Sequence, residues 1–346
     1  MSVKNETTKT TTPPQTAPTN VSFTMRAFAR EEDASRIANK LAQYIALIST
    51  SINLERLDGV TVAYDYDCAL AELDRGVQGL RTLARSNDDQ LIGVAMSPAV
   101  LRDGNVKVHL VFNGAYIEAI DTPRVDDAAE ITTDLQEAIY LIAHECAHVQ
   151  VTTEKDQAFP GTILQKPCSS YEEQIFIQIS EACWEEYAAC RLSAPFGAGQ
   201  LANYEEGLRG VLSVARQKAA AARDAFWTHR DLNRIVGELG APLAAPLRLA
   251  AYAFGHIDGC SADAEISDET LQAIELAGYT VAVDELVAKL RKLWDERSEW
   301  MFLGEFDVLA DVARDLFYEE GLLITPDGEG ANVQVWEPDS SGMTIR

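Results

Sequence analysis

The chain has 346 residues, of which 47% are hydrophobic and 24% are charged. This length can bury the core of one large domain or of two smaller ones. The 54 Asp and Glu residues outnumber the 29 Lys and Arg residues, which gives a formal net charge of -25 at pH 7. Such acidity opposes nucleic-acid binding, because contacts to phosphate need clustered cations. We therefore expect a soluble protein with no nucleic-acid partner.

The sequence also lacks the features of a membrane or secreted protein. No apolar run reaches the length that spans a bilayer, and the N-terminus lacks the apolar segment of a secretory signal. The six cysteines include no CxxC pair, so a cysteine zinc site is not expected. These observations predict a cytoplasmic protein with reduced thiols.

The N-terminal part is predicted to combine helices with short strands. Residues 1–22 are rich in Thr and Pro, so we expect a disordered tail there. A helical pattern follows at residues 30–53. His109 is interpreted as a residue of a sheet. Short strands are predicted at residues 59–64, 91–96 and 106–112, the last two as a hairpin around the turn Asp103-Gly104-Asn105.

Residues 131–151 are predicted to form one continuous and largely buried helix. Thr132 or Thr133 can cap its N-terminus, and no Gly or Pro interrupts it. Apolar side chains recur in it at helical spacing, at Leu135, Ala138, Ile139, Ile142 and Cys146.

This helix carries the sequence His144-Glu145-Cys146-Ala147-His148, which is an HExxH motif. Residues four apart lie on one face of a helix, so His144 and His148 can bind a single Zn²⁺ ion. Glu145 lies beside that face and can act as general base on a metal-bound water. Burying these polar side chains is costly unless they are paired or bound to metal. The alternative is a core helix whose histidines form hydrogen bonds, or an inactive relic of a metal site.

A two-histidine site needs a third protein ligand. In the metzincin pattern HExxHxxGxxH a third His follows, but Val151 and Glu154 occupy the Gly and final His positions here. We therefore expect a Glu from a later helix, which is predicted at residues 172–193. The candidates in that helix are Glu181, Glu185 and Glu186.

Glu186 is the preferred third ligand. It lies on an apolar stripe with Ile179, Cys183 and Cys190, where a carboxylate is costly unless it is paired or bound to metal. Glu181 and Glu185 lie on a more polar side, which favours a solvated face. Their spacing resembles the ExxxD pattern of some gluzincins, so both stay as alternatives.

By resemblance, the segments HECAH (144–148) and WEEYAACR (184–191) look like cytosolic bacterial metallopeptidases of the gluzincin type, remotely the ImmA/IrrE-like and thermolysin-like groups. The resemblance covers residues 135–191. It implies a zincin-like core, in which a small β-sheet packs on the HExxH helix and its edge strand holds an extended peptide. The chain departs from the thermolysin-like pattern, because it lacks an Asn-Glu pair before the ligand and an Asp four residues after Glu186.

The chain after residue 200 is predicted to be nearly all helical. We thus predict an α+β, mostly helical fold, with a disordered tail at residues 1–22, a zincin-like catalytic domain at residues 23–200, and a helical C-terminal region at residues 201–346 that packs on it. The expected helices in that region lie at residues 201–236, 242–255, 281–294 and 305–318, and a terminal hairpin is expected at 322–335.

These patterns predict a zinc metallopeptidase that hydrolyses a peptide or protein substrate with a metal-activated water. The predicted Zn²⁺ ligands are His144, His148 and Glu186, and the predicted general base is Glu145. A further residue must stabilise the oxyanion. The candidates for that role are Tyr171, Tyr187, His229 and His256.

Three other functions stay open. The protein could be a zinc amidohydrolase with another substrate, or a regulatory protease that cleaves a single partner. It could also be a non-catalytic interaction protein with a relic or structural metal site. A structural zinc ion normally has four protein ligands, and Cys183, one helical turn before Glu186, would then be the fourth.

Overall fold

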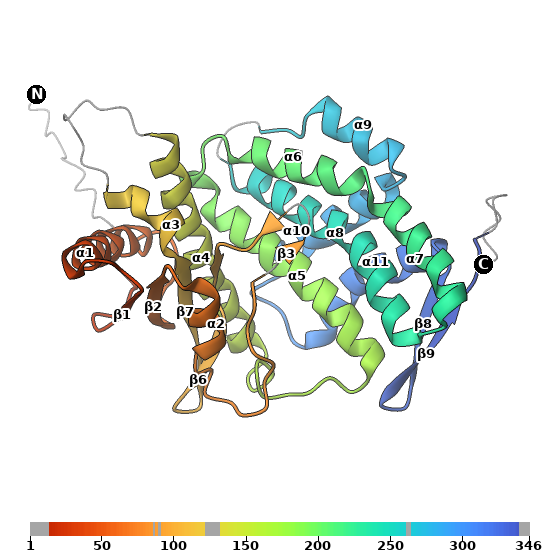
Figure 1. Ribbon diagram of the computed structural model, residues 1–346, viewed down its shortest axis with the longest axis horizontal. Coiled ribbons are helices and arrows are strands. Elements are labelled where there is room, and N and C mark those ends of the chain that lie inside the picture. The colour runs from red at the N-terminus through yellow and green to blue at the C-terminus, as the bar shows by residue number, and fades with distance from the viewer. Residues whose placement is uncertain (1–13, 86, 89–90, 122–131, 261–263, 339–346) are drawn as a thin grey trace, which may run out of the picture.

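Figure 1 shows the computed structural model of the chain, which describes residues 14–85, 87–88, 91–121, 132–260 and 264–338. The fold is α+β, with about 60% helix and a small mixed sheet, which confirms the predicted class. The sheet with its helices occupies one side of the molecule, and the later helices pack on the other side (Figure 1). None of the described helices is long and apolar enough to cross a membrane.

The main sheet has five strands. β1 (Ser22–Arg26), β2 (Leu57–Ala63) and β7 (Asn105–Asn113) run parallel. The short strands β5 (Ala95–Met96) and β6 (Ala99–Arg102) both pair antiparallel with β7. Most residues of β2 and β7 are buried, because helices cover both faces of the sheet. This explains why β7 does not alternate cleanly between apolar and polar residues.

The predicted hairpin is right in its turn and right only in part in its pairing. Asp103 and Gly104 have φ angles of 51° and 78°, as a two-residue hairpin turn requires. Such a tight turn joins β7 directly to β6, which pairs with the first half of β7, so of residues 91–96 only Ala95 and Met96 reach β7, near its end. That stretch is divided instead. β4 (Leu91–Ile92) pairs with β3 (Asn87–Asp88), and only β5 joins the main sheet.

Helices cover the two faces of the main sheet. α1 (Glu31–Ile48) and α4 (Thr133–Ala158) pack on one face, where their apolar side chains share a core with β2 and β7. α2 (Tyr66–Glu72) covers the other face with the side chains of Tyr66 and Leu70. The helix that carries the HExxH motif is therefore fixed against the sheet.

The disordered tail predicted at residues 1–22 is too long, because its last residues belong to the fold. Residues 1–13 lie outside the described part. The Thr16 hydroxyl lies within hydrogen-bond distance of the Ser49 and Ile52 carbonyl oxygens, at 2.9 and 3.0 Å, and accepts a hydrogen bond from the Leu54 amide. These bonds hold the segment against the end of α1, so it belongs to the fold although its composition is polar.

α5 (Tyr171–Ser193) joins the sheet-containing part to the helical part, because it packs on both α4 and the long helix α8 (Leu232–Gly259). The largest hydrophobic core lies among α5 and the elements after it, together with Val151 of α4 and Phe159. The remaining helices and strands are α3 (Gly114–Ile117), α6 (Gln200–Leu212), α7 (Ala215–His229), α9 (Asp268–Leu276), α10 (Thr280–Asp295), α11 (Asp307–Glu319), β8 (Leu322–Asp327) and β9 (Gly330–Val335). Short 3-10 turns lie at Glu118–Asp121, Ala194–Phe196 and Leu303–Phe306.

Two glycines allow α8 to lie directly on α5. A Cβ atom on Gly255 would be 2.3 Å from the Tyr187 carbonyl oxygen, and one on Gly259 would be 2.1 Å from the Arg191 carbonyl oxygen. Both distances are far shorter than a non-bonded contact. The absence of a side chain at these positions therefore sets the distance between α8 and the C-terminal half of α5.

Replacing Gly255 with Ala is expected to lower the free energy of unfolding by about 1–3 kcal/mol, because the two helices must separate to admit the methyl group. Gly237→Ala is the matched control on the same helix, since nothing lies within 4 Å of its added Cβ atom. There, the higher helix propensity of Ala should stabilise the protein by roughly 0.5–1 kcal/mol. Urea unfolding measures both changes. Equal effects would contradict the close helix contact.

Candidate metal centre

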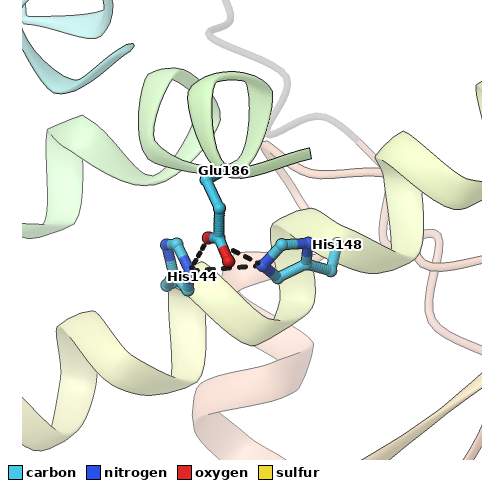
Figure 2. Close-up of side chains that lie close together, drawn as sticks. All are labelled: His144, His148 and Glu186. Atoms are coloured by element: carbon cyan, nitrogen blue, oxygen red, sulfur yellow. Dashed lines mark hydrogen bonds and ion pairs between the residues drawn. The ribbon is translucent and has the colours of Figure 1, made fainter. Parts of the chain in front are cut away.

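The helix α4 presents both motif histidines on one side. The Thr132 hydroxyl caps the helix by accepting a hydrogen bond from the Leu135 amide at 3.3 Å. His144 and His148 project next to each other, with their Nε2 atoms 3.2 Å apart (Figure 2). His144 is buried, with 7% of its surface exposed, and His148 is partly buried.

The helix α5 supplies a third side chain. Ser170 caps this helix by accepting a hydrogen bond from the Glu173 amide at 3.0 Å. Further along, Glu186 points between the two imidazoles (Figure 2). Its Oε2 atom lies 3.3 Å from His144 Nε2 and 3.6 Å from His148 Nε2. Among the described residues, this is the one group of three His, Cys, Asp or Glu side chains whose ligand atoms converge within 4.8 Å.

The three atoms have the spacing that a zinc ion requires. Ligand atoms about 2.0–2.2 Å from a tetrahedral ion lie roughly 3.3–3.6 Å from one another. The observed separations are 3.2, 3.3 and 3.6 Å. Glu186 Oε2 is buried, and its contacts with the two imidazoles lie at ion-pair distance rather than at the distance of a short hydrogen bond. A divalent cation would satisfy this oxygen together with both imidazoles, so these residues fit Zn²⁺.

The cluster holds a proton when no metal is bound. Burial lowers the pKa of His148, but the Glu186 carboxylate outweighs burial and raises this pKa to about 9. Burial raises the pKa of Glu186, whereas the two imidazoles lower it to well below its ordinary value. At pH 7, His148 is therefore a cation paired with an anionic Glu186. Zinc binds neutral imidazole, so its binding must displace this proton.

Contacts with Cys190 and Tyr252 fix the orientation of the His144 ring. Its Nδ1 atom lies 3.8 Å from the sulfur of Cys190 on α5, within hydrogen-bond reach for sulfur. The ring of Tyr252 on α8 stacks on the imidazole, with centroids 5.9 Å apart and planes inclined by 13°. A hydrogen bond from Nδ1 leaves Nε2 as the ligand atom, which is how outer contacts usually set the tautomer of a metal-bound His.

Glu145 lies beside the cluster and has 6% of its surface exposed. Its Oε2 atom accepts a hydrogen bond of 2.5 Å from the hydroxyl of Ser97. Together with His144, His148 and Glu186, it lines a single cavity. The predicted base is therefore placed next to the space that a substrate could occupy.

This cavity has a volume of about 1240 Å³. Residues 93–98, which include β5, line it, and so do Tyr204, Arg248 and Tyr252 from α6 and α8. Sites for small ligands usually have volumes of about 300–1,000 Å³, so the cavity can admit a larger molecule. The helical C-terminal region thus contributes to the lining of the site.

The two alternative carboxylates make a different contact. Lys155 is buried on α4, and its Nζ atom lies 2.6 Å from Glu181 Oε1 and 3.5 Å from Glu185 Oε1. A buried ammonium group needs such anionic partners. Glu185 also lines the cavity, but only Glu186 joins the two histidines.

The residues considered for the oxyanion do not line the cavity. The Tyr187 hydroxyl donates a hydrogen bond of 2.6 Å to Asp258, and the His256 ring is buried against Tyr140. Tyr252 does line the cavity, although its sequence context gives no signal of this. The residues outside the cavity lining are Tyr171, Tyr187, His229 and His256.

Cys183 and His109 both lie outside the cluster and have structural roles. Cys183 packs in the largest hydrophobic core and is not part of the cluster. His109 lies in the sheet, where its Nε2 atom is 2.9 Å from Thr61 Oγ1 and its Nδ1 atom is 3.1 Å from Asp58 Oδ2. Among the described residues, the cluster could therefore offer three ligands to a metal ion, with no fourth cysteine or histidine.

Comparisons with known proteins do not assign this site. The sequence matches no protein-family model, and neither curated proteins nor solved structures give a significant match. The chemistry of the site must therefore be inferred from its own residues.

We expect the metal-free protein to bind one Zn²⁺ ion and to release about one proton at pH 7. The proton comes from His148, whose pKa of about 9 lies above the solution pH. Apparent zinc affinity should therefore rise as the pH is raised toward 9. Titration calorimetry in two buffers of different ionisation enthalpy measures the released proton. Zinc binding without proton release would contradict the buried His148–Glu186 pair.

Glu186→Gln should weaken zinc binding by roughly 100-fold or more, because the site loses its anionic ligand. Glu185→Gln is the matched control, since it removes the neighbouring carboxylate on the same helix and leaves the cluster intact. Its zinc affinity should stay within a few-fold of the wild type, by the same competition titration with a chromophoric chelator. Similar losses in both variants would rule out Glu186 as the specific ligand.

Proposed function

We propose that this protein is a zinc-dependent metallopeptidase of the gluzincin type. The observation that carries the proposal is the convergence of His144, His148 and Glu186 at a large cavity, with Glu145 beside them. Three protein ligands leave the fourth position of a tetrahedral ion to water or substrate. That arrangement is typical of catalytic zinc sites, whereas structural sites have four protein ligands.

Each side chain has a distinct role in the proposed reaction. His144, His148 and Glu186 would hold Zn²⁺, which when bound supplies a Lewis acid that acidifies water and polarises a carbonyl group. Glu145 would accept the proton of the attacking water and pass it to the leaving amine. Tyr252 lines the cavity, and its hydroxyl, which is hydrogen-bonded to Glu186 in this structure, would turn to donate a hydrogen bond to the carbonyl oxygen as negative charge develops there.

The walls of the cavity favour a peptide as the substrate. β5 ends the path of hydrogen-bonded strands in the main sheet, and residues 93–97 line the cavity. A strand at the edge of a sheet offers backbone N–H and C=O groups with which an extended peptide can pair. A small sheet, its edge strand and an HExxH helix packed against it form the arrangement that a zincin-like core would have.

Glu145→Gln is expected to keep zinc at full stoichiometry and to lower peptide hydrolysis by about 10²–10⁴-fold, because the amide cannot take up the proton of the water. A library of fluorescence-quenched peptides, assayed with the zinc-loaded protein, measures this loss. A chelator should abolish the wild-type activity, and added Zn²⁺ should restore it. Full activity of Glu145→Gln, or a zinc-loaded wild type that cleaves no peptide in a diverse library, would refute the proposed function.

A further inference from the structure

Ser97 makes a direct contact with the predicted base that the HExxH motif does not account for. Its hydroxyl donates a hydrogen bond to Glu145 Oε2 at 2.5 Å, and the same Oγ atom lies 3.1 Å from the Glu145 carbonyl oxygen. Ser97 lines the cavity together with Glu145. The contact joins two segments that are 48 residues apart in the chain.

The backbone around Ser97 is held in place from both sides. Before it, the Val94 carbonyl accepts a hydrogen bond from the Asn113 amide at 2.9 Å. After it, the Pro98 carbonyl accepts one from the His109 amide at 3.1 Å. Both donors belong to β7, and a residue before proline is further restricted to extended conformations. The hydroxyl therefore approaches Glu145 from a rigid support.

We propose that Ser97 is a positioning residue for the reaction, in which its hydroxyl holds the Glu145 carboxylate by one oxygen and leaves the other to receive the proton of the attacking water. This inference rests on the proposed metallopeptidase function. A hydrogen bond to a carboxylate is stronger than one between neutral groups, so it can hold a side chain with three rotatable bonds in one orientation. Such fixed orientation of a catalytic group lowers the barrier of the step that uses it.

The position of Ser97 also links substrate binding to the base. It directly follows β5, which ends the path of strands in the main sheet and whose residues line the cavity. A peptide paired with this strand would lie against the segment that holds Glu145. One rigid segment would thus orient both the substrate and the group that deprotonates the water.

The test compares Ser97→Ala and Ser97→Thr in two backgrounds, wild type and Glu145→Ala, with zinc loaded in each. The first readout is the binding of acetohydroxamate, which chelates zinc and gives a proton to a neighbouring carboxylate. The second is the kinetics of peptide hydrolysis. Ser180→Ala is the matched control, because this buried hydroxyl donates to the Phe176 carbonyl within α5 and lies outside the cavity lining.

We expect Ser97→Ala to weaken hydroxamate binding about 10-fold and to lower kcat by a similar factor with little change in KM, as the loss of a hydrogen bond to a charged group implies. Ser97→Thr should retain both, and Ser180→Ala should change neither. In the Glu145→Ala background, Ser97→Ala should have no further effect on hydroxamate binding, because Ser97 acts through Glu145. An equal loss in both backgrounds, or wild-type kcat in Ser97→Ala, would overturn the role of Ser97 alone. Failure of the wild type to bind zinc and hydroxamate would instead overturn the proposed function, and with it this role.

Discussion

The site depends on the burial of a carboxylate from α5 against two imidazoles from α4. Neither helix could bury its polar side chains alone at an acceptable cost, because each would leave a charge or an imidazole without a partner. Brought together, the three groups form either a protonated His148–Glu186 pair or the ligand set of a divalent ion. The packing of α4 against α5 and the chemistry of the site therefore depend on the same three side chains.

The helical C-terminal region is joined to this pair of helices through α8. Gly255 and Gly259 let α8 approach the backbone of α5, and on the same helix Tyr252 stacks on His144 while Arg248 faces the cavity. β5 and Ser97, from the sheet-containing part, also line the cavity. Both parts of the chain thus contribute to the surroundings of one cluster, and α5 connects them.

The sequence predicted the parts of the site that depend on helical periodicity. The four-residue spacing of His144 and His148 fixes their relation within one helix, and the apolar stripe of α5 indicated that Glu186 points inward. Tyr252 and Ser97 could not be predicted, because their places depend on how α8 and β5 pack against α4, far away in sequence. The hairpin was predicted only in part for a related reason: β5 does pair with β7, but β4 pairs with β3, and the strand next to the turn is β6. The contact of Thr16 with the end of α1 depends on backbone carbonyl groups that composition does not reveal.

We propose that these three side chains form a zinc site with an open position. Anomalous diffraction at the zinc absorption edge, from crystals of the zinc-loaded protein, can locate the ion. We expect one strong peak about 2.0–2.2 Å from His144 Nε2, His148 Nε2 and Glu186 Oε2, with Glu145 beside the ion but not bound to it. A peak elsewhere, or an ion that carries a fourth protein ligand such as a cysteine sulfur, would contradict it.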